Sequence, residues 1–256
     1  METYKDLYII TGASKGLGSE LAIEFANKNS ILLLISRDEY SLSSIAQLCT
    51  EKGASVHVII EDVSNDLFPK KLKSCISHIL EERVNKMFLI NNASVIDPIN
   101  KLFNIDRIDQ KRVIDINLIS SIWLTSEFLR VSQTIMPIET YVVNISSGVS
   151  MKPISGWSLY CISKAGINML TSCIAEETSD WPNKVYSVAI NPGALDTDMQ
   201  NKIRASNIGE SPIAERFIKM HQEGKLNNPK KVAKRICNLI FEKSFVNGTF
   251  IDFNLV

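Results

Sequence analysis

The chain has 256 residues, of which 45% are hydrophobic and 22% are charged. That length suffices for one large core or a single α/β unit, so it does not require a second domain. Lysine plus arginine and aspartate plus glutamate number 28 each, so no net charge attracts nucleic acid or an anionic membrane, and neither is expected as a partner.

Short β-rich apolar runs alternate with longer segments that have helical spacing. This alternation predicts βαβ units in one open, doubly wound α/β domain of the Rossmann type over residues 1–256. Ligands of such sheets bind at the carboxyl ends of the strands. The expected strands are Leu7–Thr11, Ile31–Ser36, Ser55–Ile60, Met87–Ile90, Tyr141–Ser146, Val185–Ile190 and Thr249–Phe253.

A glycine-rich loop follows the first expected strand. Thr11 precedes Gly12-Ala13-Ser14-Lys15-Gly16-Leu17-Gly18, and apolar residues at helical spacing come next. The glycines allow the backbone to approach a pyrophosphate, to which a helix N-terminus presents free N–H groups. The alternative is a plain strand-to-helix turn, since glycine turns are common. Because the cluster lies between the first strand and a helix, we interpret it as a dinucleotide-binding loop.

The end of the second strand indicates which dinucleotide binds. NAD-specific sites have a carboxylate there, whereas this chain has Ser36 followed by Arg37. The Arg37 guanidinium suits the 2′-phosphate of NADPH, and Lys15 adds a second positive charge. The alternative is that both are solvated surface charges, and Asp38 is expected to begin the next helix. We therefore predict NADPH as the cofactor.

The third and fourth strand ends carry weaker signals. Asp62-Val63 follows the third strand, where a carboxylate can accept a hydrogen bond from the adenine amino group. Asn91-Asn92-Ala93 follows the fourth strand, where small residues leave room for the adenosine ribose. Taken alone, each pattern is more often a turn than a site.

Two helices are predicted from spacing and capping residues. The stretch Asp106–Val131 is expected to be one long helix with Ile114, Leu118 and Ile122 at i, i+4 and i+8, a stripe that faces either the core or a second subunit. Asn228-Pro229 provides an N-cap and a first-turn proline for a later helix.

The polar stretch 201–228 lacks an obvious strand. Because insertions at the carboxyl edge of such sheets often cover the substrate, we expect a lid over about residues 197–228. A solvated surface helix is the alternative.

The residues after the fifth strand have the pattern of an acid–base site. Tyr160 and Lys164 are spaced i, i+4 and therefore share one face of a helix. A free phenol has a pKa near 10, and a neighbouring ammonium is expected to lower it toward neutral pH. Ser147 is placed to donate a hydrogen bond to a carbonyl oxygen. A tyrosine–lysine pair at this spacing is, by itself, usually a surface pair.

Over essentially its full length the chain resembles the short-chain dehydrogenase/reductase family. The resemblance implies that Tyr160 is the proton donor, that Lys164 binds the nicotinamide ribose, that Ser147 polarises the carbonyl in preference to Ser146, and that Asn117 holds a water for proton relay. The motif residues are Thr11-Gly12-x3-Gly16-x-Gly18, Asn91-Asn92-Ala93, Asn117, Ser147, Tyr160-x3-Lys164 and Pro192-Gly193.

The glycine loop, the strand ends and the resemblance together predict the cofactor site. Ser94 departs from the family pattern, which usually has glycine there, and its side chain is expected to crowd the cofactor slightly. The expected cofactor-binding residues are Gly12, Ser14, Lys15, Gly16, Leu17, Gly18, Arg37, Asp62, Val63, Asn92, Tyr160, Lys164, Pro192, Gly193, Leu195 and Thr197.

Several stretches also resemble a narrower group, the sepiapterin reductases and the bacterial benzil reductases. This resemblance implies that Asp252 anchors a pterin through its carboxylate, while Trp157 and Met199 form apolar walls beside Ser147 and Tyr160. The alternatives are a solvated Asp252 near a loose terminus and a Trp157 that only packs in the core. The stretches are 89–93, 143–147, 156–161, 195–200 and 251–253.

The expected reaction is delivery of the pro-S hydride of NADPH to a small, flat vicinal dicarbonyl ketone, either sepiapterin-like or benzil-like. The alternatives are another short-chain reductase, such as a 3-oxoacyl reductase, and a sensor that binds NADPH without turnover. The family resemblance also implies a homodimer through the stretch 106–131 and the helix after Tyr160.

The remaining sequence features favour a cytoplasmic protein without a bound metal. Five scattered cysteines form no C-x-x-C pair and are expected to be reduced thiols, and three distant histidines lack the spacing of metal ligands. The N-terminus is polar, and the longest strongly apolar stretch, Ile31–Ile35, is too short to cross a bilayer.

Overall fold

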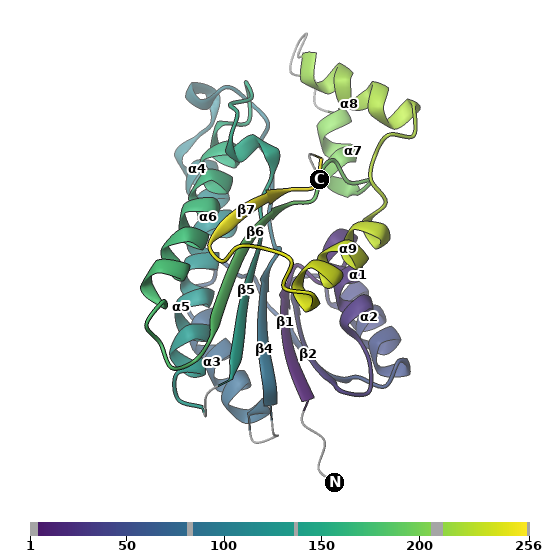
Figure 1. Ribbon diagram of the computed structural model, residues 1–256. Coiled ribbons are helices and arrows are strands. Elements are labelled where there is room, and N and C mark those ends of the chain that lie inside the picture. Colours follow the sequence, from purple (N-terminus) through teal and green to yellow (C-terminus); the bar gives the residue numbers. More distant parts are fainter. Residues whose placement is uncertain (1–4, 81–83, 136–137, 206–211, 255–256) are drawn as a thin grey trace.

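The computed structural model describes residues 5–80, 84–135, 138–205 and 212–254. Within them the strands form one parallel sheet in the order β3-β2-β1-β4-β5-β6-β7, as Figure 1 shows. The order reverses between β1 and β4, which confirms the predicted doubly wound α/β fold. The strands are β1 (Lys5–Thr11), β2 (Ser30–Ser36), β3 (Ser55–Ile60), β4 (Val84–Asn91), β5 (Glu139–Ile145), β6 (Val185–Asn191) and β7 (Thr249–Asp252).

Helices cover both faces of the sheet (Figure 1). One face carries α1 (Gly16–Phe25), α2 (Glu39–Glu51) and α9 (Pro229–Phe241). The other carries α3 (Phe68–Ile79), α5 (Ser120–Ser132) and α6 (Ser158–Glu177). Each face has its own apolar cluster, so central strands are buried on both sides, as parallel sheets require. The strand bounds differ from expectation by a few residues, and Ser146 and Phe253 lie just outside β5 and β7.

The expected single helix over Asp106–Val131 is wrong. The chain instead forms α4 (Arg107–Ile114), a π-helical turn, η2 (Asp115–Ile119), and then α5. In this turn the N–H of Ser120 donates to the carbonyl of Asp115, one residue wider than an α-helix. The turn places Asn117 inside the protein, where it is 1% exposed. The break also shifts the helical phase, so Ile122 is exposed rather than packed in the core.

The capping predictions are confirmed. Asn228 Oδ1 accepts hydrogen bonds from the first-turn amides of α9, and Pro229 is its first residue. Asp38 Oδ1 likewise accepts from Ser41 N and begins α2. All five cysteines are free thiols. Within the described ranges, no helix is both long and apolar enough to span a bilayer.

Two helices lie beyond the carboxyl ends of the strands, α7 (Asp198–Ala205) and α8 (Pro212–Gln222) (Figure 1). They occupy the stretch where a lid was expected, and residues 206–211 of that stretch lie outside the described part of the chain. Short 3₁₀ turns, η1 (Leu102–Asn104) and η3 (Gly148–Ser150), follow β4 and β5.

Candidate active site

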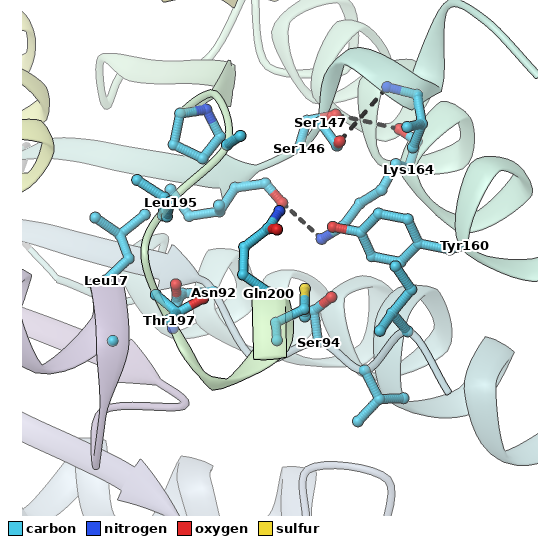
Figure 2. A pocket seen from close by; sticks show the side chains of 18 of the residues that line it. Leu17, Asn92, Ser94, Ser146, Ser147, Tyr160, Lys164, Leu195, Thr197 and Gln200 are labelled. Atoms are coloured by element: carbon cyan, nitrogen blue, oxygen red, sulfur yellow. Dashed lines mark hydrogen bonds between the residues drawn. The ribbon is translucent and has the colours of Figure 1, made fainter. Parts of the chain in front are cut away.

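The carboxyl ends of the strands open into a cleft of about 1520 Å³. It extends from the glycine loop after β1 to the end of β7, and Figure 2 shows part of it. Every residue predicted for the site lines this cleft except Gly18 and Asn117. Strand ends far apart in the sequence are therefore brought together as the topology predicted.

The glycine loop is held tightly against the neighbouring strand. Gly12 and Gly16 have φ values of +65° and +60°, which favour glycine. A Cβ on Gly18 would lie 2.2 Å from the carbonyl oxygen of Gly12, so Gly18 acts by allowing close approach of α1 to the loop and not by lining the cleft. Asn92 Nδ2 donates to the carbonyls of Thr11, at 2.9 Å, and Gly12.

The start of α1 offers free backbone N–H groups to the cleft. Its N-cap residue, Lys15, makes no side-chain capping hydrogen bond. A helix N-terminus with unpaired amides beside glycines is an anion-binding arrangement. These residues fit the pyrophosphate of a dinucleotide.

Both cations predicted for the 2′-phosphate are paired with carboxylates. Arg37 Nη1 lies 3.0 Å from Asp62 Oδ2, and Lys15 Nζ lies 2.7 Å from Asp198 Oδ2 on α7. Burial opposes ionisation of Asp62, but hydrogen bonds from Ser64 and the nearby guanidinium outweigh it and hold the Asp62 pKa below its usual range. The sequence reasoning missed both pairs. Exposed ion pairs of this kind contribute about 0–1 kcal/mol, so a phosphate dianion can displace the carboxylates.

Tyr160 and Lys164 lie on the first turns of α6 and are both buried, with exposed fractions of 8% and 3%. Lys164 Nζ donates to the carbonyl of Ile145 at 2.8 Å and lies 5.5 Å from the centre of the Tyr160 ring. Burial lowers the pKa of Lys164 to about 8. The expected pairing on one helix face is therefore present.

In the structure, burial outweighs the groups that lower the pKa of Tyr160. Burial raises the pKa of Tyr160 to about 12. The hydroxyls of Ser94 and Ser147 act in the opposite direction, and Lys164 is not among the groups that lower it. The reason is geometric, because the ammonium is directed at the carbonyl of Ile145 rather than at the phenol oxygen.

The two serines after β5 have different surroundings. Ser146 Oγ donates to Asn168 Oδ1 at 2.6 Å, so its proton is already used in a hydrogen bond within the protein. Ser147 caps η3 through a long contact of 3.4 Å from Val149 N, and its hydroxyl acts on the Tyr160 phenol. This arrangement agrees with the preference for Ser147.

Asn117 does not reach the cleft in the described structure. Its Oδ1 accepts from Val95 N and its Nδ2 donates to Val95 O, both at 2.7 Å. A longer bond of 3.3 Å runs to Ser163 Oγ on α6. Asn117 thus fixes the loop after β4 to α6, a role that its position in the sequence did not indicate.

One wall of the cleft is an apolar cluster of buried Ile96, Trp157, Tyr160 and Ile203 with partly buried neighbours that include Met199 and Phe217. Trp157 stacks on Phe217 of α8, with ring centres 5.9 Å apart and planes 7° apart. The sequence reasoning missed Phe217 because nothing local distinguishes it from a surface residue of an amphipathic helix.

Gln200 was also missed. It lies on α7, is 6% exposed and reaches into the cleft toward Tyr160 and Lys164 (Figure 2). Its Oε1 has no hydrogen-bond partner among the described residues.

Asp252 lines the cleft at the end of β7, but one of its oxygens is already occupied. Its Oδ1 accepts from Asn191 Nδ2 at 2.8 Å and from the backbone and side chain of Asn254, both at 2.9 Å. Asn191 Oδ1 in turn accepts from Gly193 N. Asp252 is therefore neither a solvated residue of a loose end nor a free two-oxygen acceptor.

A parallel sheet with a glycine loop after its first strand and a buried Tyr-x3-Lys pair at the same edge defines a dinucleotide-dependent oxidoreductase. The sequence model of the short chain dehydrogenase family matches residues 6–208. The chain belongs to this family, whose members bind a nicotinamide cofactor.

The chain is similar to proteins named as reductases and to solved structures of the same fold. The chain is 35% identical over 244 residues to a benzil reductase ((S)-benzoin forming) of Bacillus cereus, covering 95% of this chain and 97% of the relative. It is 32% identical to a sepiapterin reductase of Rattus norvegicus, covering 96% and 95%. The crystal structure of the KRED1-Pglu enzyme superposes with a TM-score of 0.81 at 25% identity, covering 96% and 100%.

Proposed function

We propose that this protein is an NADPH-dependent carbonyl reductase that reduces a small, flat vicinal dicarbonyl such as benzil, with Tyr160 as proton donor. The observation that carries the proposal is the apolar cluster beside Tyr160, which offers Trp157 and Phe217 as flat surfaces for an aromatic ketone. The similarity to benzil reductases supports the same substrate class. In this proposal α7 and α8 form the lid over the substrate.

In the proposed reaction, the cofactor is the source of the hydride and the protein is the source of the proton. When bound, NADPH would supply the hydride for the new C–H bond at the carbonyl carbon. The π electrons of the carbonyl move to its oxygen, which takes the Tyr160 proton to give the alcohol. Ser147 donates a hydrogen bond to the same oxygen, and buried Lys164 would hold the nicotinamide ribose.

Replacing Arg37 by aspartate is expected to raise the KM for NADPH about tenfold to a hundredfold, because a charge-assisted hydrogen bond contributes about 1.5–3 kcal/mol. The KM for NADH is expected to change far less, since that cofactor has no 2′-phosphate. Steady-state kinetics with both cofactors measures this. Arg130→Asp is the matched control, because Arg130 is 65% exposed and ion-paired like Arg37, which is 62% exposed. An unchanged KM for NADPH in Arg37→Asp contradicts the cofactor assignment.

A pterin is the second candidate substrate. It is favoured by the position of Asp252 in the cleft and by the similarity to sepiapterin reductases. With Oδ1 committed to three donors, only Oδ2 is left for a ligand, which is less than a two-bond anchor needs. We therefore rank an aromatic dicarbonyl above a pterin.

A substrate panel tests the proposed function. With NADPH, the protein is expected to reduce benzil with a higher kcat/KM than sepiapterin or an acetoacetyl thioester, measured by loss of NADPH absorbance. Asp252→Ala is expected to weaken benzil and sepiapterin turnover alike, since it loosens the turn at Gly193 that both require. A selective rise in the sepiapterin KM reverses the ranking. Preference for the thioester indicates a 3-oxoacyl reductase, and NADPH binding without any turnover indicates a sensor.

A further inference from the structure

A buried hydroxyl in the cleft has no use in the mechanism above. Ser94, in the loop after β4, lines the cleft. Its Oγ is inaccessible to solvent and has no hydrogen-bond partner of ordinary length and angle among the described residues. Buried polar groups in proteins are almost always satisfied, so an unsatisfied one at a reactive site calls for an explanation.

The reactive group on which this hydroxyl acts is the Tyr160 phenol. Both side chains lie at the cleft (Figure 2), and while burial raises the pKa of Tyr160, the Ser94 hydroxyl acts to lower it. Lys164 does not provide this help, since its Nζ donates to Ile145 O. The phenolate left after proton transfer thus has two hydroxyls, those of Ser94 and Ser147, as candidate donors.

We propose that Ser94 is a positioning residue for Tyr160, whose hydroxyl turns to donate a hydrogen bond to the phenol oxygen as that oxygen gains negative charge. This inference rests on the proposed function, in which Tyr160 gives its proton to the carbonyl oxygen. No covalent bond to Ser94 forms or breaks. Ser147 remains available for the carbonyl oxygen, so the two serines serve the two oxygens between which the proton moves.

The rate test compares Ser94→Ala and Ser94→Gly with the parent, using NADPH and the best ketone of the panel. Both variants are expected to lower kcat at neutral pH by about three- to tenfold, the effect of one lost hydrogen bond. The Kd for NADPH and the KM for the ketone are expected to stay within about twofold of the parent.

The pH profile separates this role from a structural one. Reduction requires protonated Tyr160, so the rate falls as pH rises through its pKa. A donor to the phenolate lowers that pKa, and its loss in Ser94→Ala moves the alkaline limb to higher pH. Thr140→Val is the matched control. Thr140 Oγ1 is also buried and has no partner in the described part of the chain, but it lies near the amino end of β5, away from the cleft. Thr140→Val is expected to leave the alkaline limb of the pH–rate profile at the same pH as in the parent.

A direct titration gives a readout that needs no turnover. In protein labelled with ¹³C at the tyrosine ring, the Tyr160 signal is assigned by its absence in Tyr160→Phe and followed against pH with NADP⁺ bound. Ser94→Ala is expected to raise the pKa of Tyr160. The role of Ser94 is overturned if Ser94→Ala changes neither the pKa of Tyr160 nor the alkaline limb of the pH–rate profile. It is also overturned if Ser94→Ala changes only the affinity for NADPH. A parent protein that reduces no ketone instead overturns the proposed function, while the titration still decides on Ser94.

Discussion

Replacing Tyr160 by phenylalanine is expected to lower kcat for ketone reduction by about a hundredfold to ten-thousandfold, the usual contribution of a positioned proton donor. The substitution removes only the hydroxyl, so the ring keeps its edge-on contact with Trp157. The free energy of unfolding and the Kd for NADPH are therefore expected to change little. Single-turnover mixing of the NADPH complex with benzil measures the chemical step, and thermal unfolding checks the fold.

Tyr141→Phe is the control for this prediction. Tyr141 is also buried, and its hydroxyl bonds to Glu139 at the start of β5, far from the cleft edge of the sheet. Its kcat is expected to equal that of the parent. If Tyr160→Phe retains the parent rate while binding NADPH, another group provides the proton.

Replacing Gly18 by alanine is expected to have the second largest effect. The new Cβ would lie 2.2 Å from the Gly12 oxygen and 2.5 Å from Asn92 Nδ2, both part of the wall of the cofactor site. Because backbone must move to make room, overpacking of this kind lowers the free energy of unfolding by about 1–3 kcal/mol. The same shift displaces the loop, so the Kd for NADPH is expected to rise tenfold or more, a loss of about 1.4 kcal/mol. Fluorescence titration with NADPH measures it.

A second glycine distinguishes loss of the site from loss of stability. Gly53, between α2 and β3, has a φ of +91°, so Gly53→Ala strains the backbone away from the cleft. It is expected to lower stability while leaving the Kd for NADPH unchanged. An alanine at position 18 that binds NADPH with the parent Kd contradicts the proposed role of the loop.

Much of the fold and of the site could be predicted from local sequence because both follow from strand ends. Each β-rich run predicts a strand, and parallel strands end at one edge. Arg37 directly follows β2, and Ser147 lies two residues after the end of β5. The cleft therefore contains nearly all of the expected residues. The caps Asp38 and Asn228 are equally local, since an N-cap needs only its own helix.

Features that depend on tertiary neighbours were not predictable in this way. At the π-turn, the side-chain amide of Asn117 bonds to the backbone of Val95, 22 residues away in the chain. The ion pairs of Arg37 and Lys15 join separate strand ends, and the ammonium of Lys164 is directed at Ile145. None of these contacts has a sequence spacing that indicates it. These contacts set the charges and hydrogen bonds of the site, whereas the residues that line it were largely predicted from the sequence.

Transfer of label from cofactor to product tests the central claim most directly. NADPH carrying deuterium on the transferred face of the nicotinamide C4 is mixed with the protein and benzil, and the product is analysed by mass spectrometry and NMR. The account predicts benzoin with deuterium at the carbinol carbon, formed in step with NADPH consumption. Benzoin without deuterium, or NADPH that remains unconsumed with every dicarbonyl, would contradict it.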